Sequence, residues 1–127
     1  MRPLHYRYVW LFGGTCLVGL VLYTTLMPLL PGATALNDKA AHAIAFMALM
    51  IWFCGVFEIR FSPLIAVTLL CLGIAIELVQ EQLPYRSAEL ADALADTAGI
   101  GAGWVLALTG LHRWAVWIES WVTFDQS

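Results

Sequence analysis

Hydrophobic residues fill four long stretches of this chain, and polar or helix-breaking residues separate them. The stretches cover residues 8–30, 40–57, 61–83 and 92–111. A helix needs about 20 apolar residues to cross the hydrocarbon core of a bilayer, and each stretch comes near that length. No polar and apolar positions alternate with the period of two that is typical of strands. The pattern therefore predicts four membrane-spanning helices.

The joints between these stretches are short, and Pro31, Pro63 and Pro84 mark them. Every backbone polar group must find a partner inside the chain when it lies in lipid, so short joints favour helices that cross and recross. We predict an all-α polytopic membrane protein with four transmembrane helices in a compact bundle. The bundle forms a single domain over residues 1–127, with an interfacial tail at 112–127.

Composition narrows the class further. Hydrophobic residues make up 61% of the 127 residues and charged residues 12%, whereas soluble domains have about 25% charged residues. So few polar residues cannot cover the surface of a small globule, which excludes a water-soluble monomer. The high hydrophobicity excludes disorder. The net charge of −3 argues against a nucleic-acid partner.

The basic residues predict an orientation. They alternate between the two ends of the predicted bundle, with Arg2, Arg7, Arg60 and Arg113 at one end and Lys39 and Arg86 at the other. Cytoplasmic loops of membrane proteins carry an excess of Lys and Arg. We therefore expect a multi-pass protein of the inner (plasma) membrane with both termini in the cytoplasm.

Most acidic residues fall on the predicted outer half, namely Asp38, Glu77, Glu81, Glu89, Asp92 and Asp96. Asp38 and His42 are spaced i, i+4 at the start of the second helix, so they share a face. Asp38 as a simple helix cap, Lys39 as a snorkelling side chain and His42 as a structural histidine bonded to Asp38 are alternatives that the sequence leaves open.

Glu77 is the strongest single candidate, because it lies among apolar residues at membrane depth. A carboxylate there is costly and usually faces a bundle interior or a wet cavity. Gln80 follows at i+3 and continues a polar stripe toward Arg86. The alternative is a purely structural ion pair of Glu77 with Arg86 or His42.

The fourth helix presents Asp92, Asp96, Gly99 and Gly103 on one face. Small residues at this spacing let helices approach closely in lipid. Close packing would bring the two aspartates against the other polar faces. We expect an outer-facing pocket formed by Asp38, His42, Glu77, Gln80, Arg86, Asp92 and Asp96.

Three functions are compatible with such a pocket. The first is binding or modification of a polar ligand, through Asp38, Lys39, Gln80, Arg86, Asp92 and Asp96. The second is an intramembrane enzyme acting on a lipid head group, with Glu77 as general base and His42 as a further acid/base or as a metal ligand together with Asp92 and Asp96. The third is a structural or interaction subunit. No metal ligands are assigned, because a single histidine argues against zinc, although oxygen-ligated Mg²⁺ or Ca²⁺ stays open. The cofactor and the oligomeric state stay unknown.

These blocks, in this order, also resemble the VanZ-like family. They are Asp38-Lys39-x-x-His42-x-x-x-Phe46, Glu77-x-x-Gln80-x-x-x-Pro84-x-Arg86 and Asp92-x-x-x-Asp96-x-x-Gly99-x-x-x-Gly103. Asp96 stands where the family usually has Asn. The resemblance implies a small bacterial integral membrane protein, with a namesake associated with teicoplanin resistance. It directs attention to membrane lipids, lipid-linked envelope precursors and glycopeptides as partners.

Overall fold

The computed structural model describes residues 2–124, and every regular element among them is a helix. The elements are α1 (Arg7–Leu26), α2 (Ala35–Val56), η1 (Ile59–Phe61), α3 (Ser62–Glu81), α4 (Leu90–Leu108), η2 (Leu111–Arg113) and α5 (Trp114–Phe124), of which η1 and η2 are 3₁₀ helices. The predicted all-α class is confirmed. The last residues of the predicted tail, 125–127, lie outside the described part.

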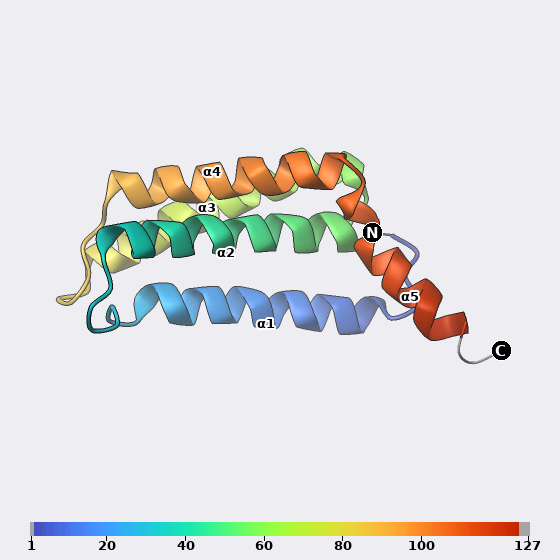
Figure 1. Ribbon diagram of the computed structural model, residues 1–127, viewed down its shortest axis with the longest axis horizontal. Coiled ribbons are helices and arrows are strands. Elements are labelled where there is room, and N and C mark those ends of the chain that lie inside the picture. The colour runs from blue at the N-terminus through green and yellow to red at the C-terminus, as the bar shows by residue number, and fades with distance from the viewer. Residues whose placement is uncertain (1, 125–127) are drawn as a thin grey trace.

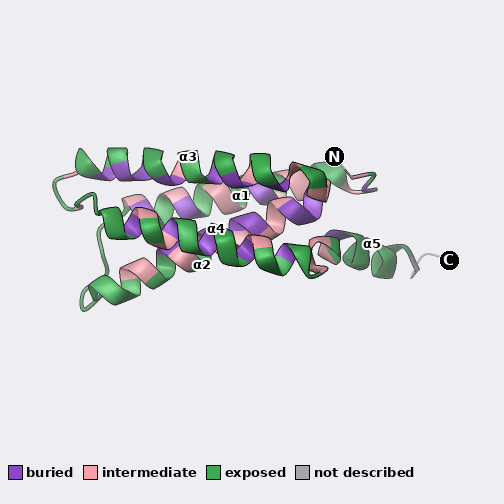
Figure 2. Cartoon of the chain, turned by 90° about the horizontal axis from the view of Figure 1, so that it is seen from above, coloured by how far each residue is buried: buried purple, intermediate pink, exposed green. Residues whose placement is uncertain are grey.

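Helices α1 to α4 run side by side with alternating direction, and α5 leaves one end of the set at an angle (Figure 1). α2 contacts each of the other three long helices, and its contact with α4 is the most extensive. Buried residues face the middle of the set and exposed residues face outward (Figure 2). The core between the helices includes Phe46, Leu49 and Met50 of α2, Ile76 of α3 and Ile100 of α4.

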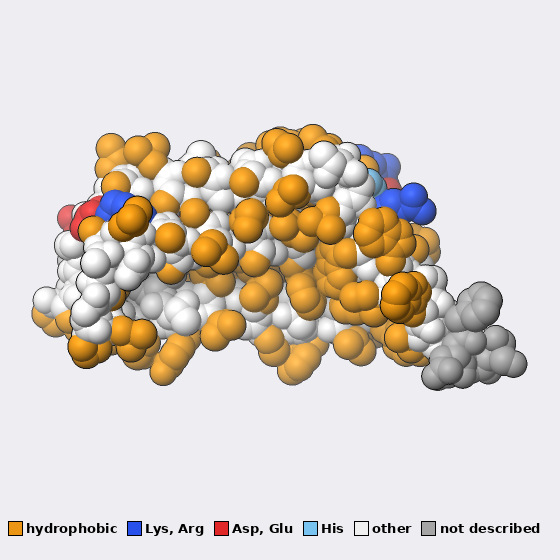
Figure 3. Space-filling model, in the orientation of Figure 1, with side chains coloured by type: hydrophobic (Ala, Val, Ile, Leu, Met, Phe, Trp, Pro, Cys, Tyr) orange, Lys and Arg blue, Asp and Glu red, His pale blue; other side chains and the backbone are white. Residues whose placement is uncertain are grey.

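Three segments are long and apolar enough to cross a membrane, namely α1, α2 and the run Ile59–Glu81. α4 passes the same test only together with α5, from which it is bent by 75°. Residues 2–124 therefore contain three, or up to four, candidate spans. On the face drawn in Figure 3, hydrophobic side chains cover the length of the molecule and charged side chains gather at its ends, as expected for a multi-pass membrane protein.

Two predicted helix boundaries were wrong. α1 ends at Leu26 rather than at residue 30, because Met27 takes an extended conformation (φ −77°, ψ 156°) in front of Pro28, as residues before proline commonly do. α2 begins at Ala35 rather than at residue 40, because the side chain of Thr34 caps it. The first shift takes residues 27–30 out of the helix, and the second adds residues 35–39 to one.

α4 packs closely on α2 through its glycines. A Cβ atom at Gly99 would collide with the carbonyl oxygen of Ala43, and one at Gly103 would lie 2.8 Å from the carbonyl oxygen of Met47. Only glycine therefore fits at these two positions without a shift of the α2 backbone. This close approach fixes the rotation of α4 about its axis and so determines which way its aspartates point.

α5 contacts the start of α1 as it leaves the bundle (Figure 1). The carboxylate of Glu119 accepts hydrogen bonds from the backbone N–H groups of His5 and Tyr6, at 2.8 and 2.9 Å, and from the indole of Trp10 at 2.7 Å. Trp114 packs on Trp10 with ring centroids 5.1 Å apart. The described part of the predicted tail is therefore bound to the bundle at the start of α1.

Candidate functional site

The bundle end that carries the α1–α2 and α3–α4 loops collects most of the charged residues singled out from the sequence. Alternating helix directions bring the first turns of α2 and α4 beside the last turns of α3 there (Figure 1). We call this group the acidic cluster. It consists of Asp38, Lys39 and His42 of α2, Glu77 of α3, Arg86 and Glu89 of the α3–α4 loop, and Asp92 and Asp96 of α4.

His42 and Asp96 form the buried centre of the acidic cluster. Nδ1 of His42 lies 2.8 Å from Oδ1 of Asp96, and the two residues are 1% and 0% exposed. The sequence had left open a bond of His42 to Asp38 on its own helix, but the partner comes from α4. In the neutral imidazole, a carboxylate at Nδ1 favours the proton on that atom, which leaves Nε2 as an acceptor.

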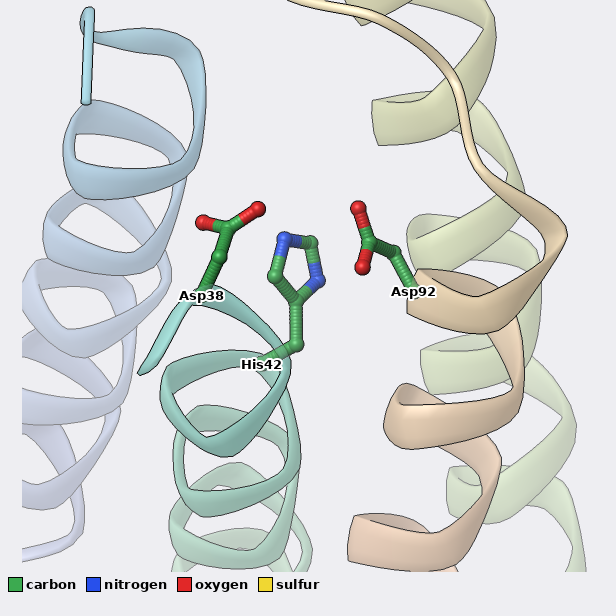
Figure 4. A group of neighbouring side chains, drawn as sticks. All are labelled: Asp38, His42 and Asp92. Atoms are coloured by element: carbon green, nitrogen blue, oxygen red, sulfur yellow. The ribbon is translucent and has the colours of Figure 1, made fainter. Parts of the chain in front are cut away.

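The other ring nitrogen of His42, Nε2, points into the space between Asp38 and Asp92 (Figure 4). It has no hydrogen-bond partner in the described chain. Donor atoms of these three side chains lie within 4.8 Å of one another. A second set of the same kind joins His42 to Glu77 and Asp96. The imidazole is thus common to both sets.

Ion pairs tie the α3–α4 loop to α2. The Arg86 guanidinium lies 3.3 and 3.4 Å from the two carboxylate oxygens of Asp38. The Lys39 ammonium donates to Glu89 at 2.8 Å and lies 3.3 Å from Oδ1 of Asp92 without hydrogen-bond geometry. Both basic residues among the predicted ligand-binding residues are therefore engaged by carboxylates.

Asp38 is not the cap of α2. Thr34 holds that position, and its hydroxyl oxygen accepts the backbone N–H of Asn37 at 3.2 Å. Asp38 follows Thr34 along the chain and belongs to the first turn of α2. Its carboxylate is therefore available to Arg86 and to the space above His42.

Glu77 lies buried at the same depth as the pair of His42 and Asp96. Its Oε2 accepts the backbone N–H of Glu89 at 3.0 Å, and its Oε1 has no hydrogen-bond partner in the described chain. The ion pair with Arg86 or His42 that the sequence left open is not formed between the described residues. Glu77 instead holds the residue that precedes α4 and thereby fixes where α4 begins.

Gln80 has a different environment from the rest of the predicted polar stripe. It is fully buried, and its amide donates to the backbone carbonyl of Thr25 at 2.7 Å. This bond joins α3 to the end of α1. The hydroxyl of Tyr85 makes a similar bond to the carbonyl of Leu26 at 3.1 Å. Both hydrogen bonds therefore hold the C-terminal end of α1 beside the acidic cluster.

Two residues of the site were missed from the sequence. Glu89 stood among the outer acids but was not assigned to the site, although it precedes α4 and lies three residues before Asp92. The hydrogen bond from Lys39 lowers the pKa of the Glu89 carboxyl below its usual value. Gly73 is the other residue, because a Cβ atom there would lie 2.7 Å from Oδ2 of Asp96. Its spacing of i−4 from Glu77, on the same helix face, was the signal available.

Unpartnered acceptor atoms distinguish the acidic cluster from an ordinary set of ion pairs. Buried side-chain atoms without a hydrogen-bond partner in the described chain are His42 Nε2, Glu77 Oε1, Gln80 Oε1, Asp92 Oδ1 and Asp96 Oδ2. With the His42 proton on Nδ1, all of them are acceptors. An unpartnered buried polar group costs about 1–3 kcal/mol. The site therefore suits a ligand that brings hydrogen-bond donors or positive charge.

An apolar groove adjoins the acidic cluster. It has a volume of about 730 Å³ and lies between the last turn of α1, the α1–α2 loop and the first turns of α2. Tyr23, Met27, Leu30 and Ala41 are among its lining residues, and Asp38 contributes the charged side chain. One carboxylate thus belongs both to the groove and to the acidic cluster.

Comparisons of the chain with protein-family models, with curated proteins and with solved structures give no match. The resemblance to VanZ-like proteins therefore stays a prediction, and the function rests on the geometry of the site.

Proposed function

We propose that this chain is a multi-pass membrane protein that binds an amphiphile. The apolar part of the amphiphile lies in the groove between α1 and α2, and its polar head reaches the acidic cluster. The single observation that carries this proposal is the position of Asp38, which lines the apolar groove and also pairs with Arg86 in the acidic cluster.

The form of the groove supports an amphiphile rather than a small polar solute. Most of its lining residues are apolar, including Met27, Leu29 and Leu30, and it lies where a helix end meets a loop. That is the level of a bilayer at which head groups and acyl chains meet. A ligand with both characters gains from apolar burial and from polar contacts at the same place.

The chemistry of the head group follows from the acceptors that lack partners. Arg86 and Lys39 are engaged by carboxylates. The atoms of the site that can still form hydrogen bonds to a ligand are therefore acceptors. Hydroxyl and amine groups of a sugar or peptide head match these acceptors, as does a cation that accompanies an anionic head. Lipid-linked envelope precursors have such heads, and the orientation proposed from the basic residues places the site on the outer side of the plasma membrane.

Filling the groove tests this proposal. The full chain is purified in a mild detergent, and native mass spectrometry records the lipids that remain bound. We expect an adduct on the wild-type protein that Ala41→Trp removes, because the indole would occupy the groove that Ala41 lines. The matched control is Ala40→Trp, at an exposed position of the same helix outside the groove lining, and it should keep the adduct.

A wild-type protein without any adduct, or an adduct retained equally by both tryptophan variants, would overturn the proposal. An adduct lost from both variants would also count against the groove. In each of these three cases the acidic cluster would hold the helices together without a role in binding an amphiphile in the groove.

A further inference from the structure

His42 carries an unused ligand atom in a buried position. The residue is 1% exposed, and its Nε2 has no hydrogen-bond partner in the described chain. The ring turns this nitrogen toward the space between the carboxylates of Asp38 and Asp92 (Figure 4). Burying an acceptor without a partner is unfavourable, so the orientation of the ring itself points to a ligand in that space.

The spacing of the three side chains is close to that of a metal site. Their donor atoms lie within 4.8 Å of one another. Donors on opposite sides of a cation with bonds of about 2.2 Å are about 4.4 Å apart. Small side-chain rotations therefore bring the Asp38 carboxylate, the Asp92 carboxylate and His42 Nε2 to bonding distance around one ion.

Asp96 supplies the outer contact that metal-binding histidines need. A histidine that ligates through one nitrogen almost always donates its other N–H to a carboxylate, a carbonyl or water. His42 Nδ1 makes this bond to Asp96 at 2.8 Å. The bond fixes the ring orientation and the position of its proton. With the imidazole proton on Nδ1, Nε2 is an acceptor, and the two ionised carboxylates that it faces have no proton to donate to it.

The charge around this space allows a cation. The basic neighbours are Lys39 and Arg86, and the acidic cluster sets five carboxylates against them. The contacts of Arg86 with Asp38 measure 3.3 and 3.4 Å, longer than the 2.7–2.9 Å that is typical of charge-assisted bonds. Lys39 makes its short bond to Glu89. Asp38 and Asp92 therefore keep lone pairs for a metal ion.

We propose that Asp38, His42 and Asp92 bind one divalent cation, with His42 Nε2 and one oxygen from each carboxylate as ligands. Two carboxylates and one imidazole suit Mn²⁺, since carboxylates favour hard cations and imidazole favours transition metals. Three protein ligands leave coordination positions open for water or an incoming oxygen. The ion site does not depend on the proposed function. Its use to hold an anionic head group at the end of the groove rests on that function.

Metal titration of the lipid-free protein tests the site separately from amphiphile binding. The full chain is purified in detergent, treated with a chelator and titrated with Mn²⁺, and electron paramagnetic resonance reports the free ion. We expect saturable binding of one ion per chain. An equal concentration of Mg²⁺ should displace little of it, because Mg²⁺ prefers oxygen ligands and binds imidazole poorly.

Two single substitutions should each weaken Mn²⁺ binding at least about tenfold: Asp38→Asn and His42→Gln. Even a change in the outer contact of a metal-bound histidine commonly costs about 10–100-fold in affinity. Glu81→Gln is the matched control, because it removes a carboxylate on an exposed turn of α3 outside the acidic cluster, and it should bind like the wild type.

The proposal would be overturned by any of three results: no saturable binding to the wild type, equal affinity in all the variants, or full displacement by equal Mg²⁺. Asp38 is partly exposed, so the fold should tolerate Asp38→Asn. This variant therefore still tests the ion site if His42→Gln fails to fold. An adduct lost in Ala41→Trp together with intact Mn²⁺ binding would separate the groove from the ion site.

Discussion

At the scale of single residues, His42 links the two halves of the candidate site. One ring nitrogen is bonded to Asp96 and the other faces Asp38 and Asp92. The first contact orients the ring, and the second nitrogen is the histidine ligand atom of the proposed ion site. Because both residues of the pair are almost completely buried, a change at Asp96 must act on stability as well as on the site.

Replacing Asp96 should separate these effects. Asp96→Ala leaves Nδ1 of His42 without an acceptor in a buried position, and we expect a loss of about 1–3 kcal/mol in the free energy of unfolding. Asp96→Asn keeps an oxygen that can accept the same hydrogen bond and should lose clearly less. Thermal unfolding of the detergent-purified variants measures the difference. Equal losses would show that the charge of Asp96, and not its hydrogen bond, stabilises the protein.

The sequence predicted the members of the site better than their pairings. Spacings of i and i+4 assigned Asp38 and His42, and Asp92 and Asp96, to common helix faces, and alternating spans placed these faces at one end of the bundle. The pairings depend on the rotation of each helix about its axis. The bond of His42 to Asp96 and the bond of Glu77 to the N–H of Glu89 therefore could not be predicted from the spacing alone.

At the scale of elements, the rotation of α4 depends on its glycines. Gly99 and Gly103 face the backbone of α2, whereas a Cβ atom at Gly101 would meet no atom within 4 Å. The number and approximate positions of the helices followed from hydrophobic length, since length and apolar character decide which segments can cross a bilayer. Their ends depended on local details, such as the cap at Thr34, that a hydrophobicity pattern does not contain.

A pair of leucine substitutions in α4 tests this account of the packing. Gly99→Leu forces a side chain into the backbone of α2, and overpacking of this kind costs about 1–3 kcal/mol or more. Gly101→Leu projects into open space and should be neutral or slightly stabilising, because leucine favours helix over glycine by up to about 1 kcal/mol. Midpoints of thermal unfolding in detergent give the comparison. If both variants lose stability equally, the close contact of α4 with α2 is not what orients the aspartates.

At the scale of the whole molecule, the two ends of the bundle differ in chemistry. The end with the α1–α2 and α3–α4 loops carries the acidic cluster and the apolar groove. The other end carries the indoles of Trp10, Trp52 and Trp114, which pack against one another. Glu119 of α5 also lies there and accepts hydrogen bonds from the residues just before α1. Indole rings prefer the interface between membrane and water. In a bundle that spans a membrane, the two ends face different compartments. The function of the site therefore depends on which way the protein inserts.

The distribution of basic residues predicts that orientation. Arg2, Arg7, Arg60 and Arg113 belong to the end with the indoles, and only Lys39 and Arg86 belong to the end with the acidic cluster. The bias depends on Lys and Arg more than on net charge, so the many carboxylates at the second end do not reverse it. We expect both termini in the cytoplasm and the acidic cluster on the outer side.

Reporter fusions measure this orientation directly. Green fluorescent protein fused after Ser127 should fluoresce, because it folds in the cytoplasm, and alkaline phosphatase at the same position should be inactive. Alkaline phosphatase inserted after Ser87, in the α3–α4 loop, is the internal control and should be active outside. Active phosphatase at Ser127 with an inactive insertion at Ser87 would place the acidic cluster in the cytoplasm. An amphiphile bound there would then have to come from the inner leaflet, which excludes ligands found only on the outer surface.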